Sequence, residues 1–349
     1  MFDRRVFLRS LMGLTAGLAV GRPPALSQTL SDPPADGVER DRLGAVLPRR
    51  RLGRTGEAVT LLGFGGSHLL QAGGGPAGEA LVERALAEGV RFFDTAQQYG
   101  SGESERRMGR WLTPKYRDVV YVMTKTQARD ADHARRDMDG CRQRLNVDVL
   151  DLMQIHHIED PAAVDRLVDN GVVDVLLEAR EKGQVRHLGF TGHNNTAAHL
   201  RMLERLERMG VELDTCQMPV NVADPGHDSF ILRVMPALIE RGYGVLAMKT
   251  LVFGQIVGQD NGWGRNRRRI APRIVPERMS LAEALGFVWS LPVSTLISGT
   301  PTEAMLTENA GIARRYPQLD EAQRQALINQ AAEFAGPQLE FYKRAPRPA

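Results

Sequence analysis

The stretches that decide the fold are VRFFDTA (90–96), VVYVMTKT (119–126) and VLDLMQIHH (149–157), each an apolar run followed by a polar or titratable residue. Runs that are apolar on both faces are typical of parallel strands covered by helices. The runs end at Asp94, Lys125 and His156, and successive end points are 31 residues apart. Because one strand-plus-helix unit takes about 30 residues, this spacing predicts a repeated βα architecture.

Similar runs recur on both sides of this stretch. They are LLGFGGS (61–67), VRHLGFTGH (185–193), TCQMPVN (215–221), GVLAMKTL (244–251) and STLISGT (294–300). Helical patterns lie between them, as in EALVERALAEG (79–89), whose apolar residues are spaced for one helix face. Eight alternating units predict an α/β fold, the (β/α)8 TIM barrel. The alternative is a doubly wound sheet, which usually carries GxGxxG after its first strand, and LGFGGSH (62–68) does not match that motif.

The first residues have the features of an export signal. MFDRR precedes a short apolar run, and Ala25-Leu26-Ser27 has the small residues of a cleavage site. We therefore expect a signal peptide over 1–27, and the Arg4-Arg5 pair predicts the twin-arginine export machinery and a periplasmic or otherwise exported protein. The alternative is an uncleaved anchor. Since a membrane span takes about 20 apolar residues, no stable membrane insertion is expected after cleavage.

The rest of the chain divides into a linker and one domain. Residues 28–48 are rich in Pro, Asp and Gly and lack periodicity, which predicts a linker, and 49–349 is assigned to the barrel. The net charge of +3 and the lack of a basic stripe argue against a nucleic-acid partner. Cys141 and Cys216 are too few for an iron–sulfur cluster or a Cys-rich zinc site, so we expect two buried thiols and no metal.

Active sites of such barrels lie at the carboxyl ends of the strands. Asp94, Lys125 and His156 should therefore meet at one rim. Tyr99 follows Asp94 by five residues, in the loop QQYGSG (97–102), and can fold over the same rim. A lone buried charge is costly, and Asp94 and Lys125 on adjacent strands offset each other.

These motifs resemble those of the aldo-keto reductases. FFDTAQQYGSGESERRMG (92–109), YVMTKT (121–126) and LDLMQIHH (150–157) are similar to the family's Asp and Tyr, Lys and His segments. RRLGRTGEAVTLLGFGG (50–66) resembles its N-terminal β-hairpin and first strand. ALGFVWSLPVSTLISGTPTEAMLTEN (284–309) resembles its eighth helix, eighth strand and cofactor-clamping segment. The resemblance extends over residues 49–312.

The resemblance implies an NAD(P)-dependent oxidoreductase that transfers hydride between a nicotinamide and a carbonyl or alcohol substrate, such as an aldehyde, ketone or sugar. Tyr99 would be the general acid and base. Its ordinary pKa is about 10, and Lys125 is expected to lower it. Asp94 would keep Lys125 charged, and His156 would orient the substrate oxygen. His156 is preferred to His157 because the family's Asp-Leu-x-x-x-His spacing runs from Asp151 to His156.

The resemblance also implies a set of cofactor-binding positions. They are Thr191, Gln217, Met248, Lys249, Leu251, Gly254, Gly299, Thr300, Met305, Glu308 and Asn309. The family's usual Asn after strand five is replaced by Gly192, so its contact is missing or comes from elsewhere, with His193 as one source. The family's basic residues for the adenosine 2′-phosphate align with Gly299 and Met305, which are not basic. Arginines within 265–273 offer an alternative phosphate contact. NADP is the expected cofactor, with NAD as the alternative.

Two other functions stay open at this point. One is a non-catalytic nucleotide-binding regulatory subunit, and the other is a Schiff-base lyase that uses Lys125 or Lys249. Asp94 argues against the lyase, because a Schiff-base lysine must lose its proton. The expected partner is a small carbonyl substrate whose identity the sequence does not give. Side chains that either line its pocket or pack in the core are Phe64, His68, Trp111, His157, Phe253 and Trp263. Folding before export also suggests the hypothesis of a nucleotide that is loaded in the cytoplasm and stays bound.

Overall fold

The computed structural model describes residues 38–258, 279–316 and 318–343. The predicted signal peptide, the first part of the predicted linker, Trp263 and the arginines within 265–273 lie outside the described residues. No helix within the described ranges is long and apolar enough to span a membrane.

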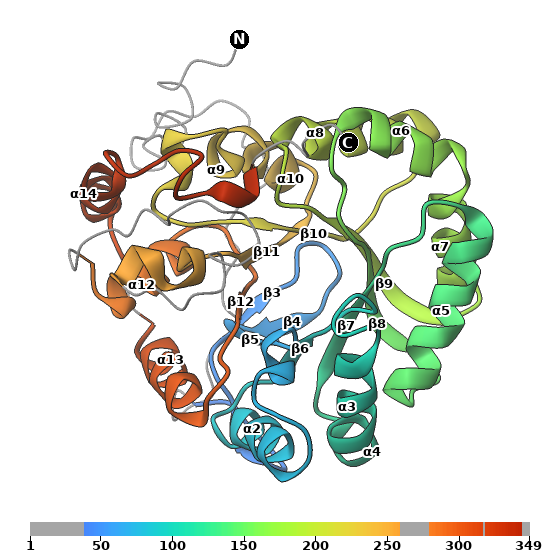
Figure 1. Ribbon diagram of the computed structural model, residues 1–349, viewed down its shortest axis with the longest axis horizontal. Coiled ribbons are helices and arrows are strands. Elements are labelled where there is room, and N and C mark those ends of the chain that lie inside the picture. Colours follow the sequence, from blue (N-terminus) through green and yellow to red (C-terminus); the bar gives the residue numbers. More distant parts are fainter. Residues whose placement is uncertain (1–37, 259–278, 317, 344–349) are drawn as a thin grey trace, which may run out of the picture.

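Eight parallel strands form a closed barrel in chain order, and the last strand pairs with the first (Figure 1). They are β5 (Leu62–Gly65), β6 (Phe92–Asp94), β7 (Tyr121–Thr126), β8 (Leu150–Ile155), β9 (Val185–Thr191), β10 (Thr215–Pro219), β11 (Gly244–Met248) and β12 (Thr295–Ser298). Each lies inside one of the eight runs identified in the sequence. The predicted (β/α)8 barrel is therefore confirmed.

Helices surround the barrel and bury their apolar faces against it (Figure 1). They are α2 (Pro76–Ala87), α3 (Glu103–Trp111), α4 (Thr113–Tyr116), α5 (Ala131–Leu145), α6 (Pro161–Asp169), α7 (Val172–Glu181), α8 (Thr196–Met209), α9 (Phe230–Arg233), α10 (Met235–Glu240), α12 (Leu281–Trp289), α13 (Glu303–Arg315) and α14 (Glu321–Ala331). Short 3₁₀ turns are η1 (His68–Leu70), η2 (Asp224–Gly226), η3 (Val252–Val257) and η4 (Phe341–Lys343). Asp130 and Asp160 begin α5 and α6 by accepting backbone N–H groups that the first helical turn leaves unpaired.

An antiparallel hairpin of β3 (Arg49–Arg51) and β4 (Ala58–Thr60) closes the amino end of the barrel, as predicted. Its Leu52 and Val59 join the apolar cluster inside the barrel, whose other members are Phe92, Tyr121, Met123, Leu152, Leu246 and Ile297. The buried Arg50 donates hydrogen bonds to the carbonyls of Leu291 at 3.0 Å and Val293 at 2.8 Å. The hairpin thus fills one end of the barrel, which leaves the other end for chemistry.

The described part of the predicted linker is packed on the barrel. Residues 38–48 contain a small hairpin of β1 (Arg40–Asp41) and β2 (Gly44–Ala45). Leu47 is buried in the main core, and Asp41 forms an ion pair with the buried Arg91 at 2.6 Å. These two contacts hold residues 38–48 on the barrel, although their composition predicted a linker. Both cysteines are buried free thiols, as expected.

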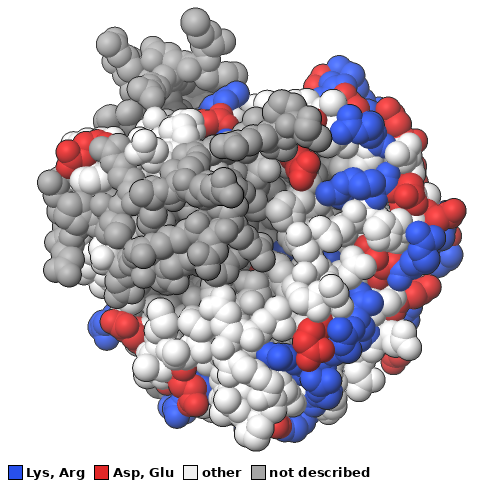
Figure 2. All heavy atoms as spheres, in the orientation of Figure 1, with Lys and Arg blue, Asp and Glu red and all other residues white. Residues whose placement is uncertain are grey.

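Charges of both signs are interspersed on the described surface. Figure 2 shows Lys and Arg side chains alternating with Asp and Glu over the helices at the right of the view. Many are paired, such as Arg201 with Asp165 at 2.8 Å. Such paired surface charges contribute little to stability individually.

Candidate active site

The barrel places the predicted catalytic residues on three neighbouring strand ends. Asp94 is the last residue of β6, Lys125 lies in β7, and His156 directly follows β8. The register aligns Asp94 with Met123 and Lys125 with Gln154. Because the carboxyl ends of parallel strands share one edge, the three side chains meet at one rim, as the spacing predicted.

Lys125 is the centre of the contacts at this rim. Its Nζ contacts Asp94 Oδ1 and donates to the Thr95 carbonyl at 2.8 Å and to the Tyr99 hydroxyl at 3.2 Å. Lys125 is only 1% exposed and Asp94 only 3%. A buried ion pair keeps its charge when further hydrogen bonds satisfy it, as the Thr95 carbonyl and the Tyr99 hydroxyl do here.

The loop that carries Tyr99 is held at both ends. The Tyr99 N–H donates to the Ala96 carbonyl at 3.0 Å, and the Ser104 N–H donates to the Tyr99 carbonyl at 3.2 Å. Nearby, the Gly66 N–H donates to the Asp94 carbonyl at 2.7 Å, and a Cβ at position 66 would lie 2.5 Å from that oxygen. Only glycine allows this approach. The loop after β5 thereby packs against the end of β6.

The protonation states follow from burial and from these contacts. Burial raises the pKa of Asp94, against the effect of Lys125. Burial acts to lower the pKa of Lys125, but Asp94 and Tyr99 outweigh it, so the pKa is raised and the amine stays charged. Burial also raises the pKa of Tyr99, because Lys125 alone does not offset burial and the nearby Asp94. Lys125 acts to lower the Tyr99 pKa, as expected, but burial outweighs it, so the expected net lowering is wrong and the Tyr99 hydroxyl stays protonated.

His156 lies edge-on to Tyr99, with ring centroids 6.0 Å apart and an interplanar angle of 84°. Burial lowers the pKa of His156 well below its usual value, with Lys125 adding to the effect, so the ring is neutral. Its covered Nδ1 has no hydrogen-bond partner in the described part of the chain. His157 lies beside it, with ring centroids 4.5 Å apart.

Arg129 fixes the backbone of this histidine pair. The Nη2 atom of Arg129 donates to the carbonyls of both His156 and His157 at 3.0 Å. Its Nη1 atom donates to the carbonyls of Gln127 and Ala128. His157 has φ of +58°, a left-handed conformation that is strained for a non-glycine residue. The guanidinium therefore holds a strained turn in the position that aims His156 at the rim. The sequence pattern gave no signal for this residue.

Replacing Arg129 with methionine is expected to lower kcat/KM about 10²-fold, because small displacements of positioned groups have effects of this size. Steady-state kinetics on a carbonyl substrate measures the change. The control is Arg135→Met, which removes an exposed arginine on α5 that pairs with Asp132. An Arg129→Met protein with wild-type kinetics contradicts the positioning role.

Acid is expected to destabilise the fold through its buried histidines. Burial lowers the pKa of His68, His157 and His199 to about 4, from an ordinary value near 6.5. Between these values the unfolded chain binds protons that the folded chain does not, so stability falls as pH falls from 6.5 towards 4. Urea midpoints at pH 7, 6 and 5 measure this, and equal midpoints contradict it. His199→Phe should give a flatter dependence.

Two predicted cofactor residues lie next to the catalytic rim. Thr191 ends β9 and Gln217 lies beside it on β10, and both are buried. Gln217 acts to lower the pKa of Asp94 through a side-chain hydrogen bond. Its covered Oε1 has no partner within the described residues. The Oε1 atom of Gln217 is therefore a buried hydrogen-bond acceptor without a partner among the described residues, and it lies beside Thr191 at the end of β9.

The other predicted cofactor residues follow β11 and β12. Met248 is the last residue of β11, and Lys249 Nζ lies 4.6 Å from the centroid of the Phe253 ring. Leu251 directly precedes η3, and Gly254 lies within it. Beyond β12 lie Gly299 and Thr300, and the covered Thr300 Oγ1 has no partner in the described ranges. On α13, Met305 and Glu308 are exposed, whereas Asn309 is buried and donates to Ser298 Oγ at 2.9 Å. Asn309 therefore also ties α13 to β12.

For one set of side chains the sequence did not decide between a place in the substrate pocket and a place in the core. The structure assigns the described members of this set to one or the other. Phe64 packs on Phe93 in the core, and Trp111 is 8% exposed beneath two arginines of α3. His68 lies against Gly299, where a Cβ would come within 2.1 Å of the ring. Phe253 stacks on Phe341 at 5.1 Å. His68, His157 and Phe253 remain near the rim, whereas Phe64 and Trp111 are core residues.

The C-terminal segment reaches the same rim, which the sequence gave no reason to expect. Lys343 donates to Asp224 at 2.7 Å and Glu340 at 2.8 Å, and the three side chains are fully buried. Tyr342 donates to Glu340 at 3.0 Å and accepts from Asn221 at 2.9 Å. In Figure 1 this segment, drawn in red, lies beside α9. Residues 340–343 are thus fixed to the loop after β10.

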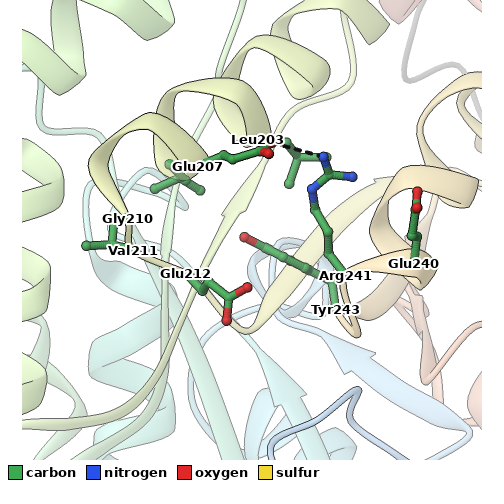
Figure 3. Close-up of a pocket in the computed structure, with 9 residues that line it drawn as sticks. Leu203, Glu207, Gly210, Val211, Glu212, Glu240, Arg241 and Tyr243 are labelled. Carbon is green, nitrogen blue, oxygen red and sulfur yellow. Dashed lines mark hydrogen bonds and ion pairs between the residues drawn. The ribbon is translucent and has the colours of Figure 1, made fainter. Parts of the chain in front are cut away.

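Two of the cavities formed by described residues lie away from the rim. One of about 450 Å³ lies between the ends of α8 and α10, which precede β10 and β11, so it opens at the amino end of the strands (Figure 3). Its Arg241 pairs with Glu207 at 3.1 Å. The other, of about 260 Å³, is a mainly apolar groove that includes Phe287 on α12 and Ile328 on α14. Neither contains a residue of the catalytic cluster.

Comparisons with known proteins agree with this geometry. The model of the aldo/keto reductase family matches residues 62–321. L-galactose dehydrogenase of Arabidopsis thaliana is 30% identical over 223 residues, which cover 60% of this chain and 67% of that protein. The 6-dehydroglucose reductase of Novosphingobium aromaticivorans is 32% identical over 191 residues, 49% of this chain and 59% of that protein.

Solved structures show the same fold. The holo form of an aldo-keto reductase from Bacillus halodurans aligns with a TM-score of 0.69 at 19% identity, covering 84% of this chain and 99% of that chain. Its apo form aligns with a TM-score of 0.64. The family match covers most of the barrel and includes the strand ends that carry Asp94, Lys125 and His156. The chain is an oxidoreductase and belongs to the aldo/keto reductase family.

Proposed function

We propose that the protein reduces the carbonyl group of a sugar or sugar-derived compound with NAD(P)H, and oxidises the corresponding alcohol in reverse, with Tyr99 as the proton donor and acceptor. The contact between Lys125 Nζ, Asp94 and the Tyr99 hydroxyl carries this proposal. The two relatives named after sugar substrates support the substrate class.

The residues of the rim suit this chemistry. Tyr99 is protonated and can donate to a carbonyl oxygen, and the charged Lys125 stabilises the tyrosinate that remains. Asp94 keeps Lys125 charged, which also argues against a Schiff-base lyase. The neutral His156 can donate a hydrogen bond to the same substrate oxygen and fix its orientation.

The chain offers a fitting cradle for a nicotinamide nucleotide. Gln217 Oε1, in β10, and Thr300 Oγ1, which follows β12, are covered polar atoms without partners within the described residues. Such orphaned groups are costly unless a ligand satisfies them. A bound nicotinamide would supply the hydride, while Thr191 and Gln217 would hold its carboxamide and Gly299 and Thr300 would approach its phosphates.

We propose NADP as the cofactor, with NAD as the alternative. The family resemblance and the arginines within 265–273, outside the described residues, support NADP. The exposed Met305 and Gly299, which replace basic residues, support NAD. Isothermal titration with each nucleotide tests this: tighter binding of NADP supports the proposal, and tighter binding of NAD overturns it. A protein that binds neither nucleotide overturns the proposed function itself.

We further propose that the twin-arginine machinery exports the folded protein with its nucleotide bound. The support is the Arg4-Arg5 pair in the sequence and the cytoplasmic origin of nicotinamide nucleotides. The test is fractionation of cells that express the wild type or the Arg4→Lys/Arg5→Lys variant, with analysis of released nucleotide. Wild type in the periplasm with bound nucleotide supports the proposal. An unchanged distribution of the variant contradicts the export route.

A further inference from the structure

We infer that His193, together with His157, forms a second binding position for substrate, which takes a hydroxyl group on the carbon next to the reacting carbonyl. This inference rests on the proposed function and deepens it, since it assigns a hydroxylated carbonyl compound as the substrate. It concerns a residue outside the catalytic cluster, which the sequence also offers as one source of the cofactor contact that Gly192 cannot make.

Three imidazole rings form a row that leads away from Tyr99. His156 is edge-on to Tyr99 at 6.0 Å, the rings of His156 and His157 are 4.5 Å apart, and those of His157 and His193 are 4.8 Å apart. The row crosses from the end of β8 to the end of β9, which are paired strands. In our inference the neighbouring carbons of a substrate whose carbonyl oxygen lies at Tyr99 and His156 extend along this row, beside His157 and His193.

Glycine at position 192 determines where the His193 ring lies. A Cβ at this position would lie 2.6 Å from the Ile158 carbonyl oxygen and 2.9 Å from the His199 ring. No larger side chain fits there without displacing the backbone of the loop after β8. His193 is therefore the first polar side chain after Thr191, and its ring contacts that of His157.

The far end of the row is fixed by the C-terminal segment. The Tyr342 ring is edge-on to His193, with centroids 6.1 Å apart. The Tyr342 hydroxyl is bonded to Asn221 and Glu340, and the fully buried Lys343 joins Glu340 to Asp224. A ring held in this way loses little freedom when it binds a ligand, which is the condition for a specific contact.

The chemistry of the row favours a neutral hydroxyl group. Burial lowers the pKa of His193 well below its usual value and that of His157 to about 4, with Lys249 next in effect on both, so the rings are neutral at pH 7. A neutral imidazole has one donor and one acceptor, as a hydroxyl group does. The covered Nδ1 of His193 has no hydrogen-bond partner of good geometry within the described residues. Hydrogen bonds with the Tyr342 backbone and the Asn194 side chain act to raise the pKa of His193, against the larger effect of burial. The covered Nδ1 of His156, in the same row, also has no partner within the described residues.

The test compares two aldehydes that differ by one hydroxyl group, lactaldehyde and propanal. We expect the wild type to prefer lactaldehyde by about tenfold or more in kcat/KM, as one satisfied hydrogen bond in a built site allows. The variant His193→Phe keeps a ring of similar shape without nitrogen. It should lose this preference, so that the ratio of kcat/KM for lactaldehyde to kcat/KM for propanal falls to about one. His193→Asn, which retains hydrogen-bonding groups, should recover part of the preference.

A control is His187→Phe, because His187 lies in the first half of β9, where its ring stacks on Tyr121 instead of joining the row. It should keep the wild-type preference for lactaldehyde. If His193→Phe loses kcat/KM equally for both aldehydes, His193 has a merely structural role and the inference is overturned. A wild type that does not prefer lactaldehyde to propanal overturns it as well. A wild type that reduces neither aldehyde with either nucleotide overturns the proposed function as well.

Discussion

Replacing Tyr99 with phenylalanine is expected to lower kcat about 10³-fold, since a positioned general acid contributes about 10²–10⁴-fold to a rate. The phenylalanine keeps the ring in its place beside Lys125 and His156 but cannot donate a proton. Steady-state turnover measures the loss, and titration of NADP and NAD should show unchanged nucleotide affinity. Loss of turnover with retained binding is the result specific to a proton donor.

The matched control is Tyr116→Phe, because the Tyr116 hydroxyl bonds to Glu83 on the outside of the barrel. Its kcat should equal that of the wild type. If Tyr99→Phe turns over at more than about a tenth of the wild-type rate, another group donates the proton. If the variant retains the biological activity of the wild type without turnover, the regulatory-subunit alternative is favoured.

Replacing Lys125 with methionine is expected to remove activity and also to destabilise the fold by about 3–5 kcal/mol, the usual cost of leaving one partner of a buried ion pair alone. Asp94 is 3% exposed and would keep a carboxyl group without its main counter-charge. Urea denaturation at pH 7 measures the change in the free energy of unfolding, and single-turnover kinetics measures the loss of chemistry.

The double variant Asp94→Asn/Lys125→Met separates the two effects. It removes both charges, so it should recover most of the lost stability while remaining inactive. Stability that stays low in the double variant shows that packing, and not the unpaired charge, causes the loss. A Lys125→Met protein within about 1 kcal/mol of the wild type contradicts the burial of the pair.

The strands and the rim cluster of Asp94, Tyr99, Lys125 and His156 were predictable because both depend on local pattern. Parallel strands need apolar residues on both faces, and the polar residue that ends each run is fixed at the barrel rim by the fold. Asp94, Lys125 and His156 obeyed this rule. The same reasoning placed Tyr99, since a loop of five residues after Asp94 cannot leave the rim.

What the sequence missed depends on contacts between distant segments. Arg129 donates hydrogen bonds to backbone carbonyls. Because every residue has a carbonyl, the sequence pattern does not indicate which ones Arg129 contacts. The pKa of Tyr99 depends on how deeply the loop is buried, so the charge of Lys125 alone gave the wrong direction. Lys343 reaches Asp224 across 119 residues, and the packing of residues 38–48 depends on Asp41 meeting Arg91. Composition identifies neither contact.

The most direct test of the account is transfer of deuterium from the nicotinamide to the substrate. The full chain is incubated with a hydroxylated aldehyde and NADPH or NADH that carries deuterium at the transferable position, and the product is analysed by mass spectrometry. We expect one deuterium on the new alcohol carbon for each nucleotide oxidised, and transfer about 10³-fold slower in the Tyr99→Phe variant. A protein that binds the nucleotide but transfers no deuterium to any carbonyl substrate, or a Tyr99→Phe variant that transfers it as fast as the wild type, would contradict the account.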